Sequence, residues 1–431
     1  MKIAIAGTGY VGLVTGVCLA EVGNPNVVCV DIDERKIERM KSGISPIYEE
    51  GLEELMIKNY ELGKIDYTTN YKSAYEDADV IMIAVGTPER SDGSANLDYI
   101  KAVAKQVAQT ITKDTLVVIK STVPIGTNDE IEKYIRKNLV NDVKVELASN
   151  PEFLSQGTAV KDTLYASRIV VGVESEWAKD ILEKIYSPFN QPIVVTNRNS
   201  AEMIKYASND FLALKISFMN DIANLCEIVG ANIEDVAKGM SYDERIGDKF
   251  LKAGIGYGGS CFPKDTKALH WLSNYNGYEL KTVKAAIEVN EAQKLKLVRQ
   301  ASKLIDSFRG LKVAVLGLTF KPETDDLREA PSIPNIKYLI ERGANVVAYD
   351  PIGIENTKKI FKDTISYTES IDEAIEGAEI CFIMTEWKDI VYYDLSKYKD
   401  KMKRALLFDG RNCYRLDDMK NLGIEYYSIG R

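Results

Sequence analysis

The sequence predicts an α/β protein in which two doubly wound, Rossmann-like domains are joined by a long central helix and a helical middle segment. Three observations support this prediction. Short apolar strands alternate with helical segments from Lys2 onward, and the same alternation restarts at Leu311. Between them, a helical segment without Pro or Gly runs from Asn199 to about Gly230. We therefore expect domains at residues 1–196, 197–309 and 310–431.

The first strand, Lys2 to Ala6, leads into the glycine motif GTGYVG at residues 7–12 and then into a helix over residues 13–23. The glycines permit a tight turn and a close approach to a pyrophosphate, which the helix N-terminus then faces. The second strand ends at Asp31, 19 residues after the last glycine. Asp31 should accept hydrogen bonds from ribose hydroxyls and repel a 2′-phosphate, which favours NAD over NADP. The nearby Arg35 and Lys36 leave NADP open, and a glycine-rich turn in another kind of α/β domain is the alternative.

Further strands of the first domain are expected to end in polar loops. The apolar runs are residues 78–85, 116–120, 145–148 and 168–173. Open parallel sheets bind ligands beyond the carboxyl ends of their strands. Thr87, Thr122 and Glu152 follow such ends, so we expect them to border a cleft, although a single Thr-Pro loop is usually only a turn.

The helical segment from Asn199 onward would be roughly 45 Å long at about 1.5 Å per residue. We expect it to connect the domains. Lys205 and Asn209 are four residues apart and therefore share a face of this helix. They are candidate site residues, with solvated side chains as the alternative.

One cysteine lies in a glycine-rich segment, Gly254 to Asp265, which reads GIGYGGSCFPKD. Pro263 suits the first turn of a helix, which places Cys261 just ahead of a helix N-terminus. Unpaired N–H groups and the helix dipole favour a thiolate there, and Asp265 lies one helical turn further on. We therefore interpret Cys261 as a nucleophile, with a buried, inert cysteine beside a tight turn as the alternative.

The chain is expected to stay helical after this segment, with one long helix over residues 283–305 and surfaces that could pair two subunits. The second strand–helix–strand pattern lacks the glycine motif, and its second strand ends at Asp350. Lys321, Arg328 and Arg411 follow predicted strands of this domain and suit an anionic ligand. Solvated loop charges are the alternative.

Composition limits the partners of the protein. The net charge of −9 argues against nucleic acid or an anionic membrane as a partner of the whole surface. The six cysteines are scattered without a C-x-x-C pair, which argues against a zinc site and a disulfide framework and favours a reducing compartment. No apolar run of about 18 residues occurs and no signal peptide is evident. We expect a cytoplasmic protein that binds no metal and spans no membrane.

A dinucleotide site combined with a nucleophilic cysteine predicts a two-step oxidation. NAD accepts hydride. A thiolate beside it can attack an aldehyde to give a thiohemiacetal, loss of hydride then gives a thioester, and water releases an acid. An alcohol could therefore be oxidised to a carboxylate in one site by two hydride transfers.

Motifs distributed nearly from end to end of the chain carry a family resemblance. They are the helix with Lys205 and Asn209 and the runs GTGYVG, VGTP, STVP, NPEFL, GGSCFPKD, FKPETDDLRE and DGRN. With them the sequence resembles the UDP-glucose 6-dehydrogenase family, within the wider nucleotide-sugar dehydrogenases. The resemblance implies NAD-dependent oxidation of UDP-glucose to UDP-glucuronate, two NADH per turnover and a homodimer. GGSCFPKD and NPEFL are highly specific for the superfamily but less specific for the sugar. GDP-mannose or a UDP-N-acetylhexosamine therefore stays an alternative substrate.

The resemblance also implies roles for individual residues. Cys261 would be the nucleophile, Lys205 would stabilise the oxyanion or take the alcohol proton, and Asn209 would orient the sugar. Asp265 and Thr122 would position water, and Glu152 would assist proton transfer in hydrolysis. Cofactor contacts would fall to Gly7, Gly9, Tyr10, Val11, Gly12, Asp31, Lys36, Thr87, Thr122, Lys264 and Arg328. Substrate contacts would fall to Glu152, Phe153, Leu154, Lys205, Asn209, Arg245, Lys252, Ala253, Gly254, Gly258, Lys321 and Arg411.

The resemblance also implies one role across subunits, and the sequence departs from the family at one position. Arg245 would reach the sugar site of a neighbouring subunit. Gln156 stands where the family usually has an acidic residue, which bears on a cofactor contact. Two other functions stay open: a two-electron dehydrogenase of the hydroxyacid type, with Lys205 and Asn209 active and Cys261 incidental, and a non-catalytic NAD-binding or sensing protein.

Overall fold

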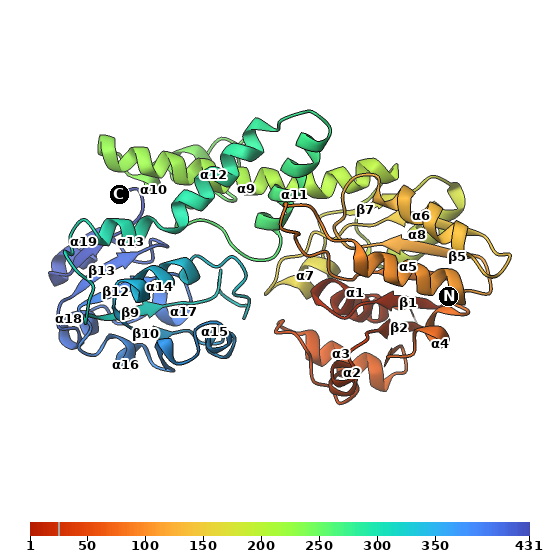
Figure 1. Cartoon of the computed structure of the whole chain (residues 1–431), viewed down its shortest axis with the longest axis horizontal. Coiled ribbons are helices and arrows are strands. Elements are labelled where there is room, and N and C mark those ends of the chain that lie inside the picture. The colour runs from red at the N-terminus through yellow and green to blue at the C-terminus, as the bar shows by residue number, and fades with distance from the viewer. Residues whose placement is uncertain (25) are drawn as a thin grey trace. The chain divides into compact units, whose positions relative to one another are not determined.

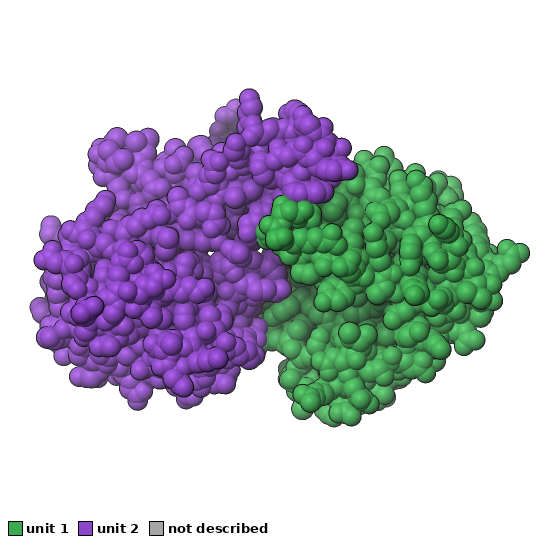
Figure 2. Space-filling view, viewed as in Figure 1, with its two compact units in different colours: residues 1–208 green, residues 209–431 purple. Residues whose placement is uncertain are grey.

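The computed structural model describes residues 1–24 and 26–431, which form two compact units. Unit 1 comprises residues 1–208 and unit 2 residues 209–431 (Figure 2). Each unit contains one sheet and its own apolar cores. The predicted fold class, two Rossmann-like sheets with a long helix and a helical middle segment, is confirmed (Figure 1).

Unit 1 is built on an eight-stranded sheet with the order β3-β2-β1-β4-β5-β6-β7-β8. The strands are β1 (Ile3–Ala6), β2 (Val27–Val30), β3 (Ile65–Thr68), β4 (Val80–Ile83), β5 (Thr115–Ile119), β6 (Val145–Ser149), β7 (Ile169–Gly172) and β8 (Ile193–Thr196). The first six pair in parallel, but β7 pairs antiparallel with β6, and β8 then runs parallel to β7. The expected parallel sheet therefore ends at β6, and β3 and β8 were not among the expected strands.

Helices cover both faces of this sheet. They are α1 (Tyr10–Glu21), α2 (Glu34–Lys41), α3 (Leu52–Glu61), α4 (Tyr71–Tyr75), α5 (Asp98–Thr110), α6 (Thr127–Asn138), α7 (Ala159–Leu164) and α8 (Glu176–Tyr186). Successive side chains of a strand point to opposite faces. Accordingly, Ile3 and Ile5 of β1 belong to one buried cluster, whereas Ala4 and Ala6 belong to another. The central strands are thus buried on both faces, which is why they read as continuous apolar runs.

The predicted long helix is α9 (Arg198–Val229), a single helix of 32 residues (Figure 1). It starts within unit 1 and continues into unit 2. Among the described residues, no helix has the combination of length and apolar character that crossing a membrane requires.

Unit 2 contains a six-stranded parallel sheet with the order β11-β10-β9-β12-β13-β14. Its strands are β9 (Lys312–Leu316), β10 (Asn345–Tyr349), β11 (Ser366–Thr368), β12 (Ile380–Ile383), β13 (Leu406–Asp409) and β14 (Glu425–Tyr427). The order repeats that of the first six strands of unit 1, which confirms the second doubly wound sheet. Val313 and Val315 face one core of unit 2, and Ala314 and Leu316 face the other.

The helices of unit 2 other than α9 are shorter. They are α10 (Ile233–Ser241), α11 (Phe262–Tyr275), α12 (Lys281–Lys294), α13 (Lys296–Ala301), α14 (Ser332–Glu341), α15 (Ile354–Phe361), α16 (Ile371–Ile375), α17 (Lys388–Val391), α18 (Ser396–Lys401) and α19 (Leu416–Leu422). The prediction of one helix over residues 283–305 is wrong, because the helix breaks at Leu295. Asn335 donates to the backbone oxygen of Lys294 at 2.6 Å. The carbonyl of Lys294 therefore has a side-chain partner from α14 at the point where α12 ends.

Candidate active site

The glycine turn of unit 1 has a shape that only glycine allows. Gly7 has a φ of 97°, and a Cβ placed on Gly12 would lie 1.9 Å from the carbonyl oxygen of Gly7. Helix α1 begins at Tyr10 with Gly9 as its N-cap and has no acidic residue in its first turn. The first turn of α1 therefore carries no negative side chain that would repel the pyrophosphate of a dinucleotide. The phenol of Tyr10 donates to the carbonyl of Tyr48 at 3.1 Å.

Asp31 follows β2 at the same edge of the sheet. Its Oδ2 accepts from the backbone and the hydroxyl of Thr8 at 3.0 and 2.6 Å, and its Oδ1 accepts from the backbone of Asp33 at 3.0 Å. Burial opposes the ionisation of Asp31, but these hydrogen bonds outweigh it and hold its pKa below the usual range. Lys36 lies 3.7 Å from Oδ2. Asp31 is thus a fixed anion at the end of β2, where a dinucleotide presents its ribose.

The loops after β4 and β5 meet, as the sequence predicts for neighbouring strands. The hydroxyl of Thr87 donates to the carbonyl of Thr122 at 2.9 Å, and Ser121 donates to the carbonyl of Val85 at 2.6 Å. Because β6 lies next to β5, the loop that carries Glu152 starts at the same sheet edge. Thr87, Thr122 and Glu152 therefore follow three adjacent strands.

Glu152 and Lys205 form the most buried ion pair among these candidates. The Lys205 ammonium lies 2.9 Å from Oε1 of Glu152, and the side chains are 3% and 9% exposed, respectively. Oε2 of Glu152 accepts from the backbone of Leu154 at 2.8 Å. The ring of Phe153 lies under Lys205 at 5.4 Å and under Arg168 at 3.8 Å. The NPEFL loop and α9 together therefore hold a carboxylate and an ammonium where both are almost fully buried.

A second buried lysine, Lys120, stands close to this pair and was not among the predicted residues. It donates to Oδ1 of Asn150 at 2.8 Å and lies within reach of the Tyr186 hydroxyl at 3.5 Å. Burial lowers the pKa of Lys120 to about 8; the charge of Glu152 opposes this shift, and that of Lys205 adds to it. Three ionisable groups of unit 1 are therefore electrostatically coupled.

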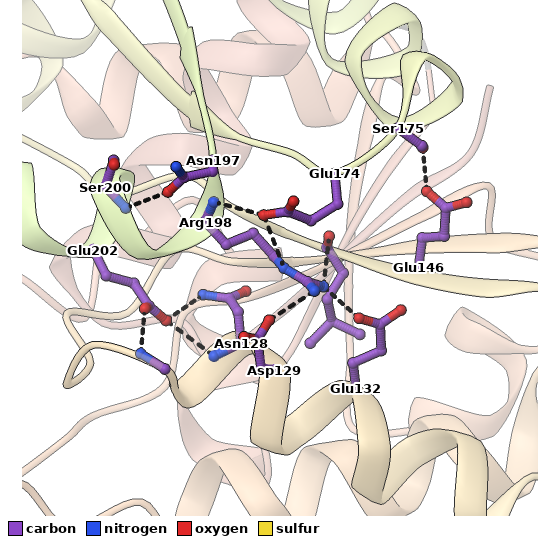
Figure 3. A network of polar contacts seen from close by, with 12 residues as sticks. Asn128, Asp129, Glu132, Glu146, Glu174, Ser175, Asn197, Arg198, Ser200 and Glu202 are labelled. Atoms are coloured by element: carbon purple, nitrogen blue, oxygen red, sulfur yellow. Dashed lines mark hydrogen bonds and ion pairs between the residues drawn. The ribbon is translucent and has the colours of Figure 1, made fainter.

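Polar contacts of Arg198 and Glu202, which precede Lys205 by seven and three residues, anchor the start of α9 (Figure 3). Glu202 accepts from the backbone of Gly126 at 2.6 Å and from the backbone and side chain of Asn128 at 2.9 and 2.7 Å. The guanidinium of Arg198 pairs with acidic groups that come from α6 and from the segment before α8: Asp129, Glu132 and Glu174. Glu202 thus satisfies N–H groups at the start of α6. These contacts fix the position of Lys205 within unit 1.

Cys261 of unit 2 lies where the sequence predicts, at the N-cap of α11, with Pro263 in the first turn. Its Sγ lies 3.7 Å from the hydroxyl of Ser260. The side chain is partly exposed, in contrast to the buried Cys226 and Cys381. A thiol at a helix N-terminus meets the positive end of the helix dipole, which favours the thiolate.

Asp265 lies in the first turn of α11 and is 1% exposed. Lys264 donates to its Oδ1 at 2.6 Å, and Asn209 donates to its Oδ2 at 2.7 Å. Its backbone N–H closes the first turn onto the carbonyl of Cys261 at 2.8 Å. The structure thus brings together Asn209, Cys261, Lys264 and Asp265, which were all predicted as site residues.

The glycines before Cys261 permit close packing against the loops of the second sheet. A Cβ on Gly258 would lie 2.5 Å from the carbonyl oxygen of Glu329, and one on Gly254 would lie 3.0 Å from that of Gly410. The N–H of Gly259 donates to the carbonyl of Arg328 at 2.8 Å. The cysteine segment therefore packs directly against the predicted anion-binding loops of unit 2.

The basic residues of these loops differ in their settings. Arg411 donates to the carbonyls of Met384 and Phe320 at 2.9 and 3.1 Å, so part of its guanidinium holds loops together. The ammonium of Lys321 lies 5.6 Å from the ring of Phe320. Arg328 is largely exposed and forms a bidentate pair with Asp326. An anionic ligand at Arg328 would therefore share it with a carboxylate.

The predicted substrate residues Lys252, Ala253 and Arg245 differ in their exposure. Lys252 is exposed, whereas its neighbour Ala253 is buried. Arg245 is 89% exposed and pairs with Asp243, two residues away. Arg245 therefore extends into solvent, and its action on a neighbouring subunit stays a prediction.

The loop with Gln156 is held by an acid from another segment. Glu49 accepts from the backbone of Gly157 at 2.8 Å and of Ala159 at 2.6 Å. The departure at Gln156 therefore lies in a loop that unit 1 already fixes through its backbone. Sequence reasoning missed Glu49, because nothing in the sequence relates it to a loop more than a hundred residues away.

In the second sheet, as in the first, an acid after the second strand binds the loop that follows the first strand. Asp350 follows β10 as Asp31 follows β2, but it is buried. Its Oδ2 accepts from the backbone of Leu318 at 2.7 Å, of Thr319 at 3.2 Å and from the Trp387 indole at 3.1 Å. The protein's own carboxylate thus occupies the amides of the loop after β9.

The sequence matches family models over most of its length. The UDP-glucose/GDP-mannose dehydrogenase family matches with its NAD binding domain at residues 1–190, its central domain at 199–292 and its UDP binding domain at 314–416. UDP-glucose 6-dehydrogenase YwqF of Bacillus subtilis is 51% identical over 431 residues, covering 100% of this chain and 98% of that protein.

Two solved structures are similar over the whole chain. A UDP-glucose dehydrogenase from Pyrobaculum islandicum has a TM-score of 0.92 at 35% identity, covering 99% of this chain and 96% of that one. A UDP-D-ManNAc dehydrogenase from Pyrococcus horikoshii has a TM-score of 0.88 at 27% identity, covering 100% of this chain and 99% of that one. Both structures therefore share the fold of this chain over nearly its whole length.

Proposed function

Because the chain belongs to the UDP-glucose/GDP-mannose dehydrogenase family, whose members are NAD-dependent oxidoreductases, we propose that it oxidises UDP-glucose to UDP-glucuronate and reduces two NAD per turnover. The observation that carries the proposal is Cys261 at the start of α11, with Asp265 buried one turn away. A two-electron dehydrogenase needs neither a thiol at a helix N-terminus nor a fixed carboxylate beside it. A thioester route needs both.

The residues of unit 1 fit the binding of NAD and the handling of protons. When bound, NAD supplies the hydride acceptor for both oxidations. The glycine turn would hold the pyrophosphate, and Asp31 would accept from the ribose hydroxyls. As an ammonium, Lys205 stabilises the oxyanion that develops when the alcohol is oxidised, because a cation lowers the energy of nearby negative charge. To take the proton of the alcohol, Lys205 must instead be the neutral amine. Glu152 keeps Lys205 in place and assists proton transfer in the last step.

The residues of unit 2 fit the covalent steps. The Cys261 thiolate adds to the aldehyde carbon and forms a C–S bond, giving a thiohemiacetal. Loss of hydride from that carbon gives a thioester. Asp265, together with Thr122, positions a water that adds to the thioester carbon, and the C–S bond breaks to release the acid and the thiolate. Asn209 orients Asp265 and the sugar.

The remaining predicted contacts are proposed for the ligands in the same way. Tyr10, Val11, Lys36, Thr87, Lys264 and Arg328 would contact the cofactor. Phe153, Leu154, Lys252, Ala253, Gly254, Gly258, Lys321 and Arg411 would contact the substrate. UDP as the nucleotide is supported by the family's UDP binding domain over residues 314–416 and by the names of the relatives. We propose that the domains comprise residues 1–196, 197–309 and 310–431.

The proposed assembly is a homodimer formed along α9. Phe211, Phe218 and Leu225 are seven residues apart and are 62%, 51% and 52% exposed. Residues at this spacing lie on one side of a helix, so they form an apolar stripe on the surface of unit 2. Large exposed apolar patches mark interaction sites, and a second copy of the chain supplies a matching stripe. Arg245 would then act on the partner's sugar site.

The cytoplasm is the proposed location. The proposed reaction needs Cys261 as a thiol. A reducing compartment keeps thiols free.

The test is a turnover assay that counts NADH and acid per sugar consumed. UDP-glucose, GDP-mannose, UDP-N-acetylglucosamine and UDP-N-acetylmannosamine are compared at equal concentrations, because the Pyrococcus horikoshii relative carries the name of a UDP-D-ManNAc enzyme. We expect two NADH per UDP-glucose and the highest kcat/KM for that sugar. A ratio of one would contradict the thioester route, and a preference for another sugar would contradict the substrate.

A further inference from the structure

Asp210 is a buried acid that none of the proposed steps uses. It follows Asn209 on α9 and is 4% exposed. Neither of its carboxyl oxygens has a hydrogen-bond partner within residues 1–24 and 26–431. A buried carboxylate without a partner is costly, because the protein interior solvates charge poorly.

The neighbour of Asp210 is the proposed water-positioning acid. The two groups of α11 that act on Asp210 are Asp265, which is also buried, and Lys264. From the segment before α11, Tyr257 is close enough to be affected by the charge of Asp210. Unit 2 therefore places two buried carboxyl groups beside one partly exposed ammonium.

Asp265 and Asp210 differ in their hydrogen-bond partners. Asp265 accepts from Lys264 and from Asn209, so both of its oxygens are satisfied and a cation lies next to it. The hydrogen bonds of Lys264 and Asn209 to Asp265 leave Asp210 without a comparable contact. Like charges at short distance in a poorly solvated site disfavour double ionisation. The single negative charge of the pair therefore belongs on Asp265.

Titration behaviour agrees with this division. Burial raises the pKa of Asp210 to about 8, and the charge of Asp265 acts in the same direction, while Lys264 opposes both. Burial also raises the pKa of Tyr257 to about 12, so the phenol stays neutral wherever Asp210 titrates. Asp210 therefore changes charge in the mildly alkaline range.

We propose that Asp210 is a positioning residue that holds a proton beside Asp265, so that this cluster carries one negative charge rather than two during turnover. The effect on rate rests on the proposed function, since it needs Cys261 and Asp265 to act in thioester chemistry. That chemistry passes through a thiolate and an oxyanion, and a second negative charge nearby disfavours both. Ionisation of Asp210 therefore slows acid formation, although Asp210 touches no reacting atom.

The first experiment needs no substrate. Infrared spectra of the full-length protein are recorded at about pH 7 and about pH 9, on either side of the titration. We expect a protonated-carboxyl band that disappears on going to the higher pH. The Asp210→Asn variant lacks this band, whereas Asp221→Asn, which changes an exposed acid of the same helix, keeps it. Subtraction of the variant spectrum removes the contributions of Glu202 and Asp409, whose pKa values burial also raises. A wild-type protein without the band would overturn the proposal.

The second experiment compares the rate of acid formation at about pH 9 with that at about pH 7, a ratio that cancels differences in active-enzyme content. We expect this ratio to be about tenfold higher in Asp210→Asn than in the wild type, since the variant cannot acquire the second charge. Asp221→Asn should have the wild-type ratio. Equal ratios in all three proteins would overturn the positioning role. The infrared band without any turnover of nucleotide sugars would instead contradict the proposed function and leave the protonation of Asp210 established.

Discussion

The ammonium of Lys205 lies 2.9 Å from the carboxylate of Glu152, and neither side chain is more than 9% exposed. A buried ion pair contributes little net stability, because desolvation offsets the attraction. The role of this ion pair is to fix the position of Lys205. It holds a cation at a defined place on α9 without the mobility that a solvated lysine would have.

Replacing Lys205 by Met should lower kcat by at least about a hundredfold, because the oxyanion loses its cation. NAD binding should change little, since the glycine turn and Asp31 are separate from the pair. Steady-state kinetics with UDP-glucose and a titration with NAD measure the two effects. Lys215→Met serves as the control, since Lys215 lies on the same helix and bonds a backbone carbonyl at 3.1 Å. Wild-type kcat in Lys205→Met would exclude the assigned role.

Replacing Cys261 by Ser should stop acid formation, with a loss of at least about a thousandfold, because a hydroxyl does not ionise where a thiol does. Mass spectrometry of the wild type during turnover should detect a sugar adduct on the peptide that contains Cys261. Cys413→Ser is the matched control, because Cys413 is also partly exposed but burial raises the pKa of its thiol well above the usual range. If acid formation survived in Cys261→Ser, the two-electron alternative would be favoured.

Replacing Asp31 by Asn should reduce the preference for NAD over NADP by about tenfold or more, since the charge that repels a 2′-phosphate is removed. Asn keeps an oxygen that can accept from Thr8, so the turn should stay intact. The ratio of kcat/KM for the two cofactors is the measurement. Asp33→Asn controls for net charge, because Asp33 caps α2 and asparagine caps helices equally well. An unchanged ratio would show that another group selects the cofactor.

Replacing Lys120 by Met should stabilise the protein more at neutral than at alkaline pH. The pKa of Lys120 falls from 10.5 to about 8 on burial, so the unfolded chain binds the extra proton between these values and the wild type gains stability as pH rises through them. Below about pH 8 the wild type bears the full cost of the buried charge. The difference in unfolding free energy between variant and wild type should therefore shrink by about 2–3 kcal/mol from pH 7 to pH 10.5.

Urea denaturation at the two pH values measures this difference. Lys113→Met, a substitution at a partly exposed lysine, should show a much smaller pH dependence. An equal pH dependence in both variants would mean that Lys120 is not titrating in the folded protein.

Replacing Phe218 by Asp should convert the proposed dimer to a monomer, since a charge in the centre of the α9 stripe has no partner in the paired state. Sedimentation velocity over a range of concentrations gives the oligomeric state. Tyr392→Asp, at an aromatic residue that is 83% exposed and lies outside α9, should leave it unchanged. A monomeric wild type would contradict the assembly, and a dimeric Phe218→Asp would place the interface elsewhere.

Several site features follow from short-range patterns, and the sequence predicts these well. Asp31 depends on the strand–helix–strand unit of residues 2–31, which fixes a strand end, and Cys261 depends on the segment 254–265, which fixes a helix start. The pairing of the loops at Thr87 and Thr122 follows from strands that neighbour one another in the sheet. In each case local geometry determines where the side chain points.

Other features depend on partners that are distant in the sequence. Lys120 and Asp210 titrate unusually because of burial, and neither is distinguished from a solvated residue by its neighbours in the sequence. The one available signal for Asp210 was an acid beside Asn209 on a largely apolar stretch of helix. The break at Leu295 was missed because Asn335, forty-one positions from Lys294, takes the carbonyl there. The reversal at β7 leaves no trace in a four-residue apolar strand.

The inward-facing carboxylate of Asp350 makes the two sheets unequal despite their common strand order. Installing the GTGYVG run after β9 would not by itself create another nucleotide cradle, because that loop's amides would still be engaged from within. The two sheets therefore share a strand order but not an equally accessible acid: Asp31 binds its loop and stays partly exposed, whereas Asp350 is enclosed by groups of the chain itself.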